Sequence, residues 1–173
     1  MAADPCSDRE SSPPPAADWL SDEEMRTWLD LGAVIMWLPA ALDAQLKQDA
    51  GLSHFEYQVL AMLSQSPDRT ARMGDIAVLA NGSPSRLTHA IARLEGRGWV
   101  TRTPGAGRSV LAGLTPSGWD KVVATAPGHV EAVRRYVFDT LTPAQVTGLG
   151  VAVARIREAL RDPDDYPDGC PRP

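Results

Sequence analysis

The stretch over residues 72–114, RMGDIAVLANGSPSRLTHAIARLEGRGWVTRTPGAGRSVLAGL, decides the fold of this chain. A short segment with helical apolar spacing covers 73–80 and stops at Asn81-Gly82, a pair typical of a left-handed helix end. A longer segment over 84–97 starts at Ser83-Pro84 and ends before a glycine. A capping serine with proline at the first helical position favours a helix start. The sequence therefore predicts two helices joined by a tight turn.

Two strands are expected immediately after the second helix, near 99–102 and 109–114. The Thr-Pro-Gly-Ala-Gly sequence between them has turn chemistry, and Thr70 to Arg72 can add a short third strand. A helix-turn-helix followed by a β-hairpin, or wing, suits DNA. A helix fits the major groove, and a ribbon reaches the backbone or the minor groove. We therefore predict a winged helix-turn-helix.

Further helices are expected on both sides of this region. Ser21 with Glu24, Ser53 with Glu56 and Thr142 with Gln145 have capping-box spacing, and Thr115-Pro116 supplies another start. Proline inside a helix removes a hydrogen bond, so Pro39 and the Pro127-Gly128 pair should kink or interrupt their helices. The predicted fold class is mainly α with a small β-hairpin (α+β). Its outer helices are expected over 21–48, 53–65, 116–139 and 143–161.

Charge is unevenly distributed along the 173 residues. The formal net charge is −5, yet residues 69–108 carry seven arginines against Asp75 and Glu95, a local excess of five positive charges. A basic lobe on an acidic body fits a protein that presents one face to phosphate. No apolar run approaches the length of about 18 residues that spans a bilayer. The N-terminus lacks signal-peptide features, so we expect a cytoplasmic protein without a membrane partner.

The candidate DNA-binding residues lie on the second helix and on the wing. Leu87, Ile91 and Leu94 share one face of the helix and predict its buried stripe. The residues expected to face DNA are polar or basic: Ser83, Ser85, Arg86, Thr88, His89, Arg93, Arg102 and Arg108. Arginine is the commonest reader of guanine, whereas Arg102 on the first wing strand suits a phosphate. Arg108 at the wing tip suits a narrow minor groove.

The string SRLTHAIARLEGRGWVTR over 85–102, followed by LTPSG over 114–118, resembles the MarR family of bacterial transcriptional regulators. The similarity extends over about 21–161. It implies a homodimer whose N- and C-terminal helices interleave, with two winged lobes on palindromic double-stranded DNA, and most often a repressor. Ala106 stands where the family usually has an aspartate that holds the wing arginine.

The resemblance also sets the domain organisation. A MarR-like domain is expected over 19–161, between disordered tails over 1–18 and 162–173. Within it, the winged helix-turn-helix covers about 53–115, and the dimerisation helices cover about 21–48 and 116–161.

The resemblance further implies a pocket for a small aromatic effector between the dimerisation helices and the winged lobe. Its candidate residues are Trp28, Trp37, His54 and Tyr57, a mixture suited to planar phenolic ligands. Each of these side chains also suits an ordinary core position.

Other kinds of site find little support in the sequence. Cys6 and Cys170 lie in the tails, so neither a disulfide framework nor a cysteine sensor is expected. The three histidines fall on different elements, and zinc needs three or four convergent ligands. We expect no metal, no cofactor and no catalytic residues, because no phosphate-binding loop or nucleophile motif occurs.

Two alternatives remain beside DNA binding. The first is a winged-helix protein-interaction module, for which an excess of five positive charges in one segment has no purpose. The second is an enzyme acting on a small molecule, which the absence of catalytic motifs disfavours.

Overall fold

The computed structural model describes residues 18–160 apart from Asn81 and Arg108. Both predicted tails, with Cys6 and Cys170, therefore lie outside the described residues, except that Asp18 is described. The chain divides into two compact units, one up to Ile35 and one from Met36 onward. Each is treated by itself below.

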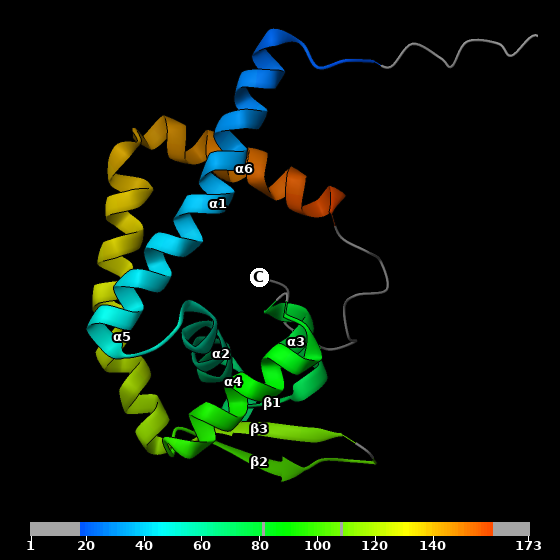
Figure 1. The fold of residues 1–173 in the computed structure, drawn as a ribbon, viewed down its shortest axis with the longest axis vertical. Coiled ribbons are helices and arrows are strands. Elements are labelled where there is room, and N and C mark those ends of the chain that lie inside the picture. Colours follow the sequence, from blue (N-terminus) through cyan, green and yellow to red (C-terminus); the bar gives the residue numbers. More distant parts are fainter. Residues whose placement is uncertain (1–17, 81, 108, 161–173) are drawn as a thin grey trace, which may run out of the picture. The chain divides into compact units, whose positions relative to one another are not determined.

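Six α-helices and three strands make up the described chain (Figure 1). In chain order they are α1 (Asp22–Ala50), α2 (His54–Gln65), β1 (Thr70–Arg72), α3 (Met73–Leu79), α4 (Pro84–Gly96), β2 (Val100–Pro104), β3 (Val110–Leu114), α5 (Pro116–Tyr136) and α6 (Pro143–Ala159). Two short 3-10 helices, η1 (Pro67–Arg69) and η2 (Phe138–Thr140), lie in the connections. The predicted helix-turn-helix and wing are thus present, and the fold class is confirmed.

The predicted capping signals at helix starts form the bonds expected of them. Ser53 accepts from the Glu56 amide while the Glu56 side chain accepts from the Ser53 amide, which closes a full capping box. Thr142 and Gln145 do the same at the start of α6. Such bonds satisfy amides that have no partner within the helix.

Neither of the two prolines interrupts its helix. Pro39 lies inside α1 and Pro127 lies inside α5, and both helices continue through them. Proline removes one helical hydrogen bond, and the turns on either side retain theirs. Helix α3 stops at the expected place before Asn81-Gly82: its C-cap is Ala80, and the Gly82 amide donates to the Ala77 carbonyl at 3.0 Å, a bond typical of a left-handed helix end. Asn81 itself lies outside the described residues.

The three strands form one antiparallel sheet in the order β1-β3-β2. Arg72 pairs with Leu111, and Arg102 pairs with Ala112. The winged lobe, defined here as residues 54–114, packs its helices around a core to which Leu46 and Leu52 also contribute. Its fully buried large side chains include Val59, Leu60, Leu63, Ile76, Leu87, Ile91, Leu94 and Val100.

The corner between α4 and β2 is bonded to the first turn of α5. Gly98 adopts a φ of +73°, which ends α4 in the left-handed region that favours glycine. The Trp99 carbonyl accepts from the Thr115 amide at 3.0 Å, and the Gly98 carbonyl accepts from the hydroxyls of Thr115 and Ser117 at 2.7 and 2.9 Å. A Cβ at Gly118 would overlap the Trp99 carbonyl oxygen, so only glycine allows this approach.

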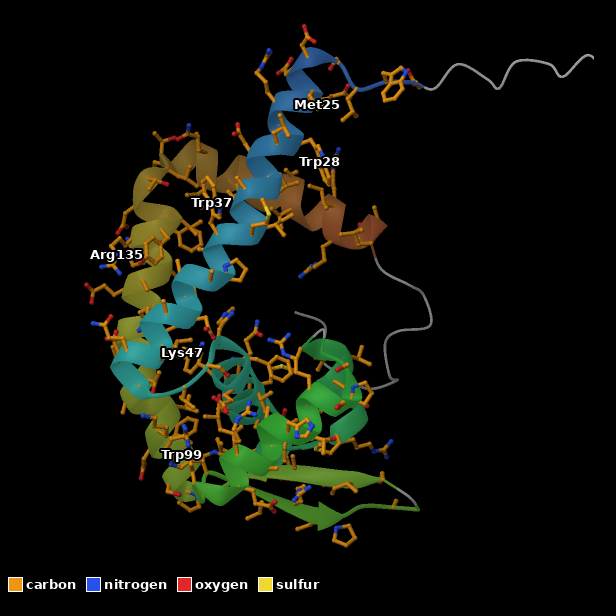
Figure 2. The ribbon with its side chains drawn as sticks, in the orientation of Figure 1. Met25, Trp28, Trp37, Lys47, Trp99 and Arg135 are labelled. Carbon is orange, nitrogen blue, oxygen red and sulfur yellow. The ribbon has the colours of Figure 1, made fainter. Side chains whose placement is uncertain are left out.

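Helices α1 and α6 bury little of their apolar surface. In α6 no residue is buried, and Val151, Val153 and Ile156 expose 55%, 48% and 46% of their side chains. In α1, Leu42 and Leu46 are buried, whereas Trp37 is 71% exposed (Figure 2).

Among the described residues, α1 is the one helix long and apolar enough to cross a membrane, judged by length and composition. No such segment was expected from the sequence, because Asp30 and Asp43 bound the apolar stretch of α1 and leave no unbroken run of about 18 residues. A helix whose apolar side chains are covered by another protein chain would meet the same criteria of length and composition.

Candidate nucleic-acid interface

Helix α4 has one buried face and one exposed polar face. Leu87, Ala90, Ile91 and Leu94 are buried, so the predicted core stripe is confirmed and gains Ala90. The helix starts at Pro84 behind the Ser83 cap, whose hydroxyl accepts from the Arg86 amide at 3.2 Å. Its first two turns therefore present their polar side chains outward, at the end from which recognition helices usually contact bases.

Three predicted DNA residues in this part of α4 are exposed: Ser85, Thr88 and His89. The Thr88 hydroxyl donates to the Pro84 carbonyl at 2.8 Å, which leaves its lone pairs as acceptors. Within the described chain, the side chains of Ser85 and His89 make no hydrogen bond or ion pair. These groups are available to a ligand that approaches the exposed face.

Arg86 and the turn before α4 both rest on Phe55 of α2. The Arg86 guanidinium lies over the Phe55 ring at 4.2 Å from its centroid, a cation–π contact. A Cβ at Gly82 would lie 2.7 Å from a ring carbon of Phe55, which is why the turn needs glycine there. Phe55 is 5% exposed. A buried aromatic side chain thus fixes the start of the helix.

Arg93 is bonded to Glu56, a contact that the sequence analysis did not foresee. Its Nε donates to Glu56 Oε1 at 2.6 Å, and the carboxylate also accepts from the Ser53 amide at 2.8 Å and hydroxyl at 3.0 Å. Glu56 is 4% exposed, whereas the Arg93 side chain is 57% exposed. Burial by itself raises the pKa of Glu56, but the bonds from Ser53 and Arg93 outweigh it and hold that pKa below its ordinary value.

Arg102 on β2 is paired with Glu95 near the end of α4. The guanidinium Nε and one terminal nitrogen donate to the same carboxylate oxygen at 2.9 and 2.5 Å. The two side chains expose 39% and 36% of their surface. Because Glu95 offsets part of the charge of Arg102, this arginine adds less positive charge to the predicted DNA-binding face than the sequence suggested. The guanidinium still reaches solvent.

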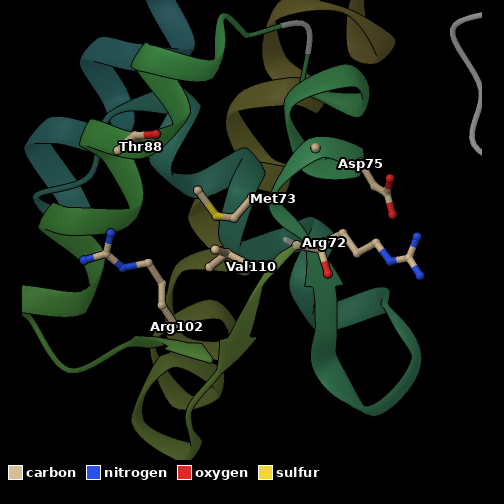
Figure 3. Close-up of a pocket in the computed structure, with 8 residues that line it drawn as sticks. Arg72, Met73, Asp75, Thr88, Arg102 and Val110 are labelled. Carbon is tan, nitrogen blue, oxygen red and sulfur yellow. The ribbon is translucent and has the colours of Figure 1, made fainter. Parts of the chain in front are cut away.

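An open cavity of about 560 Å³ lies between α3, α4 and the wing (Figure 3). Thr88 and Arg102 line it and were predicted to face DNA; the remaining lining residues were not predicted. They are Arg72, Met73, Gly74, Asp75, Ser109 and Val110. Only the pairing of β1 with β3 brings Arg72 to the wing, and a three-residue strand gives a weak sequence signal.

The tip of the wing is described around Arg108, which itself lies outside the described residues. The Gly105 amide donates to the Ser109 carbonyl at 2.9 Å, and the Ser109 hydroxyl donates to the Ala106 carbonyl at 2.8 Å. Gly107 has a φ of +66°. The predicted glycine-rich turn is therefore present, and the role of Arg108 stays a prediction.

Of the four candidate effector residues, two lie on α2 and two on α1. His54 and Tyr57 of α2 both lie near His129 of α5, with ring centroids 6.0 and 4.6 Å apart. Burial lowers the pKa of both histidines and raises the pKa of Tyr57. Trp28 and Trp37 expose 57% and 71% of their side chains, and Figure 2 shows each projecting from α1. Sequence reasoning missed His129 because it comes more than 70 residues after His54 and Tyr57 in the chain.

Known proteins resemble this chain in sequence and in fold. A family model described as MarR family matches residues 52–107. Sco3205, a MarR family transcriptional regulator from Streptomyces coelicolor crystallised in complex with DNA, is 42% identical, with a TM-score of 0.79 over 86% of this chain and 98% of its own. AbsC, a MarR family transcriptional regulator from the same organism, is 36% identical, with a TM-score of 0.76 over 84% and 99%.

BldR, a transcriptional regulator from Sulfolobus solfataricus, is 20% identical with a TM-score of 0.65, over 78% of this chain and 96% of its own, and so shares the fold. No curated protein matches the chain by sequence. The solved relatives are regulators rather than enzymes, which removes the enzyme alternative. With two relatives above one-third identity over most of its length, the chain belongs to the MarR family of transcriptional regulators.

Proposed function

We propose that this protein binds double-stranded DNA in a sequence-specific manner and regulates transcription as a homodimer, most simply as a repressor that occludes a promoter. The observation that carries this is the exposed polar face of α4, with Ser85, Thr88 and His89 exposed in its N-terminal half. The 42% identical relative Sco3205 was crystallised with DNA, which supports the same partner here. DNA binding also implies a cytoplasmic protein.

Within this proposal the predicted DNA-binding residues take different parts. Ser85, Thr88 and His89 face base edges, because they lie near the start of the recognition helix. Ser83 and Arg86 lie beside that start and contact phosphate or flanking bases. Arg102 contacts the backbone, and Arg108 is assigned to the minor groove as the family resemblance implies.

The homodimer is supported by uncovered apolar surface. In α6, Val151, Val153 and Ile156 are exposed, and in α5 Val123 and Val130 expose 52% and 55%. Several apolar side chains left exposed along two helices favour a protein interaction site. A second copy would cover these helices and place two α4 helices on successive half-sites about 34–36 Å apart, matching a palindrome. In this arrangement residues 53–115 bind DNA and the helices outside them dimerise.

We also propose that a small planar effector relieves binding. Its support is chemical: His54 and Tyr57 are half-buried or buried polar aromatic groups that lie together with His129. Trp28 and Trp37 stay candidates through their aromatic character. An effector acts only through a difference in affinity between the DNA-binding conformation and another.

One selection experiment tests the DNA-binding function. Purified protein is mixed with fragmented genomic DNA, and bound fragments are recovered and sequenced over several rounds. We expect enrichment of one palindromic sequence, and a labelled duplex carrying it should bind more tightly than a scrambled duplex by at least about 10³-fold. Recovery of random fragments with no preference for the palindrome would instead support the protein-interaction alternative.

A further inference from the structure

We infer that Glu56 is the positioning residue of the recognition helix, and that Arg93 contributes to DNA binding through Glu56 rather than by touching DNA. This inference rests on the proposed function. It concerns the contact between the first turn of α2 and the C-terminal half of α4.

The two carboxylate oxygens of Glu56 have separate partners. Oε2 accepts from the Ser53 amide and hydroxyl and so completes the α2 cap, whereas Oε1 accepts from Arg93 Nε at 2.6 Å. The Glu56 side chain is 6% exposed, so both of its oxygens are largely shielded from solvent. A buried carboxylate that loses a cationic partner is strongly destabilised. Arg93, and with it α4, is therefore held to the α2 terminus.

A second contact between the same two segments lies at the other end of α4. Phe55, the neighbour of Glu56, touches Arg86 and leaves room only for glycine at position 82. Arg86 and Arg93 are seven residues apart, or about 10 Å along a helix. Two attachments at this separation fix the rotation of α4 about its own axis. That rotation decides which side chains face a base pair.

The first turn of α2 is itself fixed from the other side. The His54 amide donates to Asp43 Oδ1 of α1 at 2.8 Å. The first turn of α2, which contacts α4 through Phe55 and Glu56, is thus bonded to α1 through His54. A displacement of α2 relative to α1 would move both contacts to α4 together.

The position of Arg93 argues against direct reading. It lies in the last turn of α4, whereas recognition helices contact bases mainly through their N-terminal residues. Its Nε, one of the donors of the planar fork that reads guanine, already binds Glu56. The exposed terminal nitrogens would have to reach DNA while Nε stays on the protein.

Glutamine at position 93 separates the two roles. The glutamine Nε2 is bonded to Cδ, the same covalent position that Nε has in arginine, so Arg93→Gln can keep the donor to Glu56 while removing the guanidinium tip. Arg93→Ala removes both. If Arg93 acts by positioning, we expect Arg93→Gln to bind the selected duplex within about threefold of wild type and Arg93→Ala to bind at least about tenfold more weakly.

The salt dependence of binding is measured in the same titrations by fluorescence anisotropy. A lost phosphate contact lowers the slope of log K against log salt by about 0.9. We expect Arg93→Ala to leave the slope unchanged. A slope reduced by about one, or equal losses for the Gln and Ala variants, would overturn the inference in favour of direct contact.

Glu56→Gln supplies the reciprocal test. Glutamine is accepted in a capping box, so the Ser53 bonds survive, but its amide places a donor opposite the Arg93 donor. We expect Glu56→Gln to weaken specific binding about as much as Arg93→Ala. The double variant Glu56→Gln/Arg93→Ala should be no weaker than the weaker single variant, because both remove one contact. Additive losses would contradict the shared contact.

Two controls keep the outcome interpretable. Asp139→Asn removes another ion-paired carboxylate, exposed and outside the winged lobe, and should change affinity less than about twofold. Thermal unfolding by circular dichroism gives the temperature range in which each variant is folded, and all titrations are done within it. If wild type itself shows no duplex binding, the proposed function fails. If wild type binds but Arg93→Gln behaves like Arg93→Ala, only the positioning inference fails.

Discussion

Helices α4 and α6 are of similar length but differ in how much of them the chain itself covers. Four of the 13 residues of α4 are buried, and its arginines contact Phe55 and Glu56. None of the 17 residues of α6 is buried, although several are apolar. The winged lobe therefore has its own buried core, whereas α6 leaves its apolar side chains uncovered by the described residues. Under the proposed dimer, folding and assembly depend on different residues, and substitutions can separate them.

The largest effect is expected at the α4–β2 corner. Gly118→Ala would press a methyl group against the Trp99 carbonyl, and backbone atoms cannot move aside cheaply. We expect a loss of about 3 kcal/mol or more in the free energy of unfolding, measured with urea. Gly148→Ala is the matched control in α6, because nothing lies within 4 Å of its Cβ position. It should be neutral or stabilising by up to about 1 kcal/mol. Equal losses for both would contradict the contrast between the helices.

A charge on α6 should break assembly without unfolding the winged lobe. Ile156 is 46% exposed, so Ile156→Asp costs little in one chain but buries an unpaired carboxylate in a dimer interface. We expect light scattering to give twice 18.6 kDa for wild type and a mass near 18.6 kDa for the variant at micromolar concentration. The helical circular dichroism signal should persist. A wild-type protein that is a stable monomer would remove the proposed dimer.

Acid should weaken the contact between α2 and α4. The pKa of Glu56 is lowered in the folded protein, so its contribution to stability is fully present above the ordinary glutamate pKa and is lost as pH falls through the lower folded value. Glu56→Gln does not titrate at this position. The stability difference between wild type and Glu56→Gln should therefore be constant near neutral pH and shrink in acid. A difference independent of pH would mean that the Glu56 charge does not hold α4.

The smallest change is expected for the partly exposed pair of Arg102 on β2 and Glu95 on α4. Arg102→Ala should weaken specific and scrambled duplexes alike and lower the salt slope by about 0.9, since it removes one phosphate contact. Its effect on unfolding should stay below about 1 kcal/mol, because the pair with Glu95 is partly exposed. A selective loss for the palindrome would show that Arg102 reads sequence.

Local signals in the sequence predicted the fold well. The capping box at Ser53 and Glu56 depends on residues three apart, and the buried stripe of α4 depends on one helical period, so both could be predicted. The Arg93–Glu56 pair joins residues 37 apart. The capping box alone accounts for a glutamate at position 56. No local pattern in the sequence indicates that its second carboxylate oxygen binds Arg93 of α4.

The same limit applies to the effector candidates and the cavity. His129 joins His54 and Tyr57 only because α5 returns to α2 after the wing. Trp28 and Trp37 are candidates because of their aromatic character. Their exposure could not be predicted, because helical spacing alone does not show which face of α1 is covered. Arg72 comes to the edge of the cavity through a strand pairing that spans about 40 residues.

The bonds at the α4–β2 corner have a mechanical consequence. The carbonyls of Gly98 and Trp99 are bonded to the first turn of α5, and Gly118 leaves no gap there. If α5 tilts, its first turn therefore moves the α4–β2 corner, and the C-terminal end of α4 moves with that corner. For a pair of such chains, the angle between their α5 helices would set the distance between the two DNA-facing surfaces.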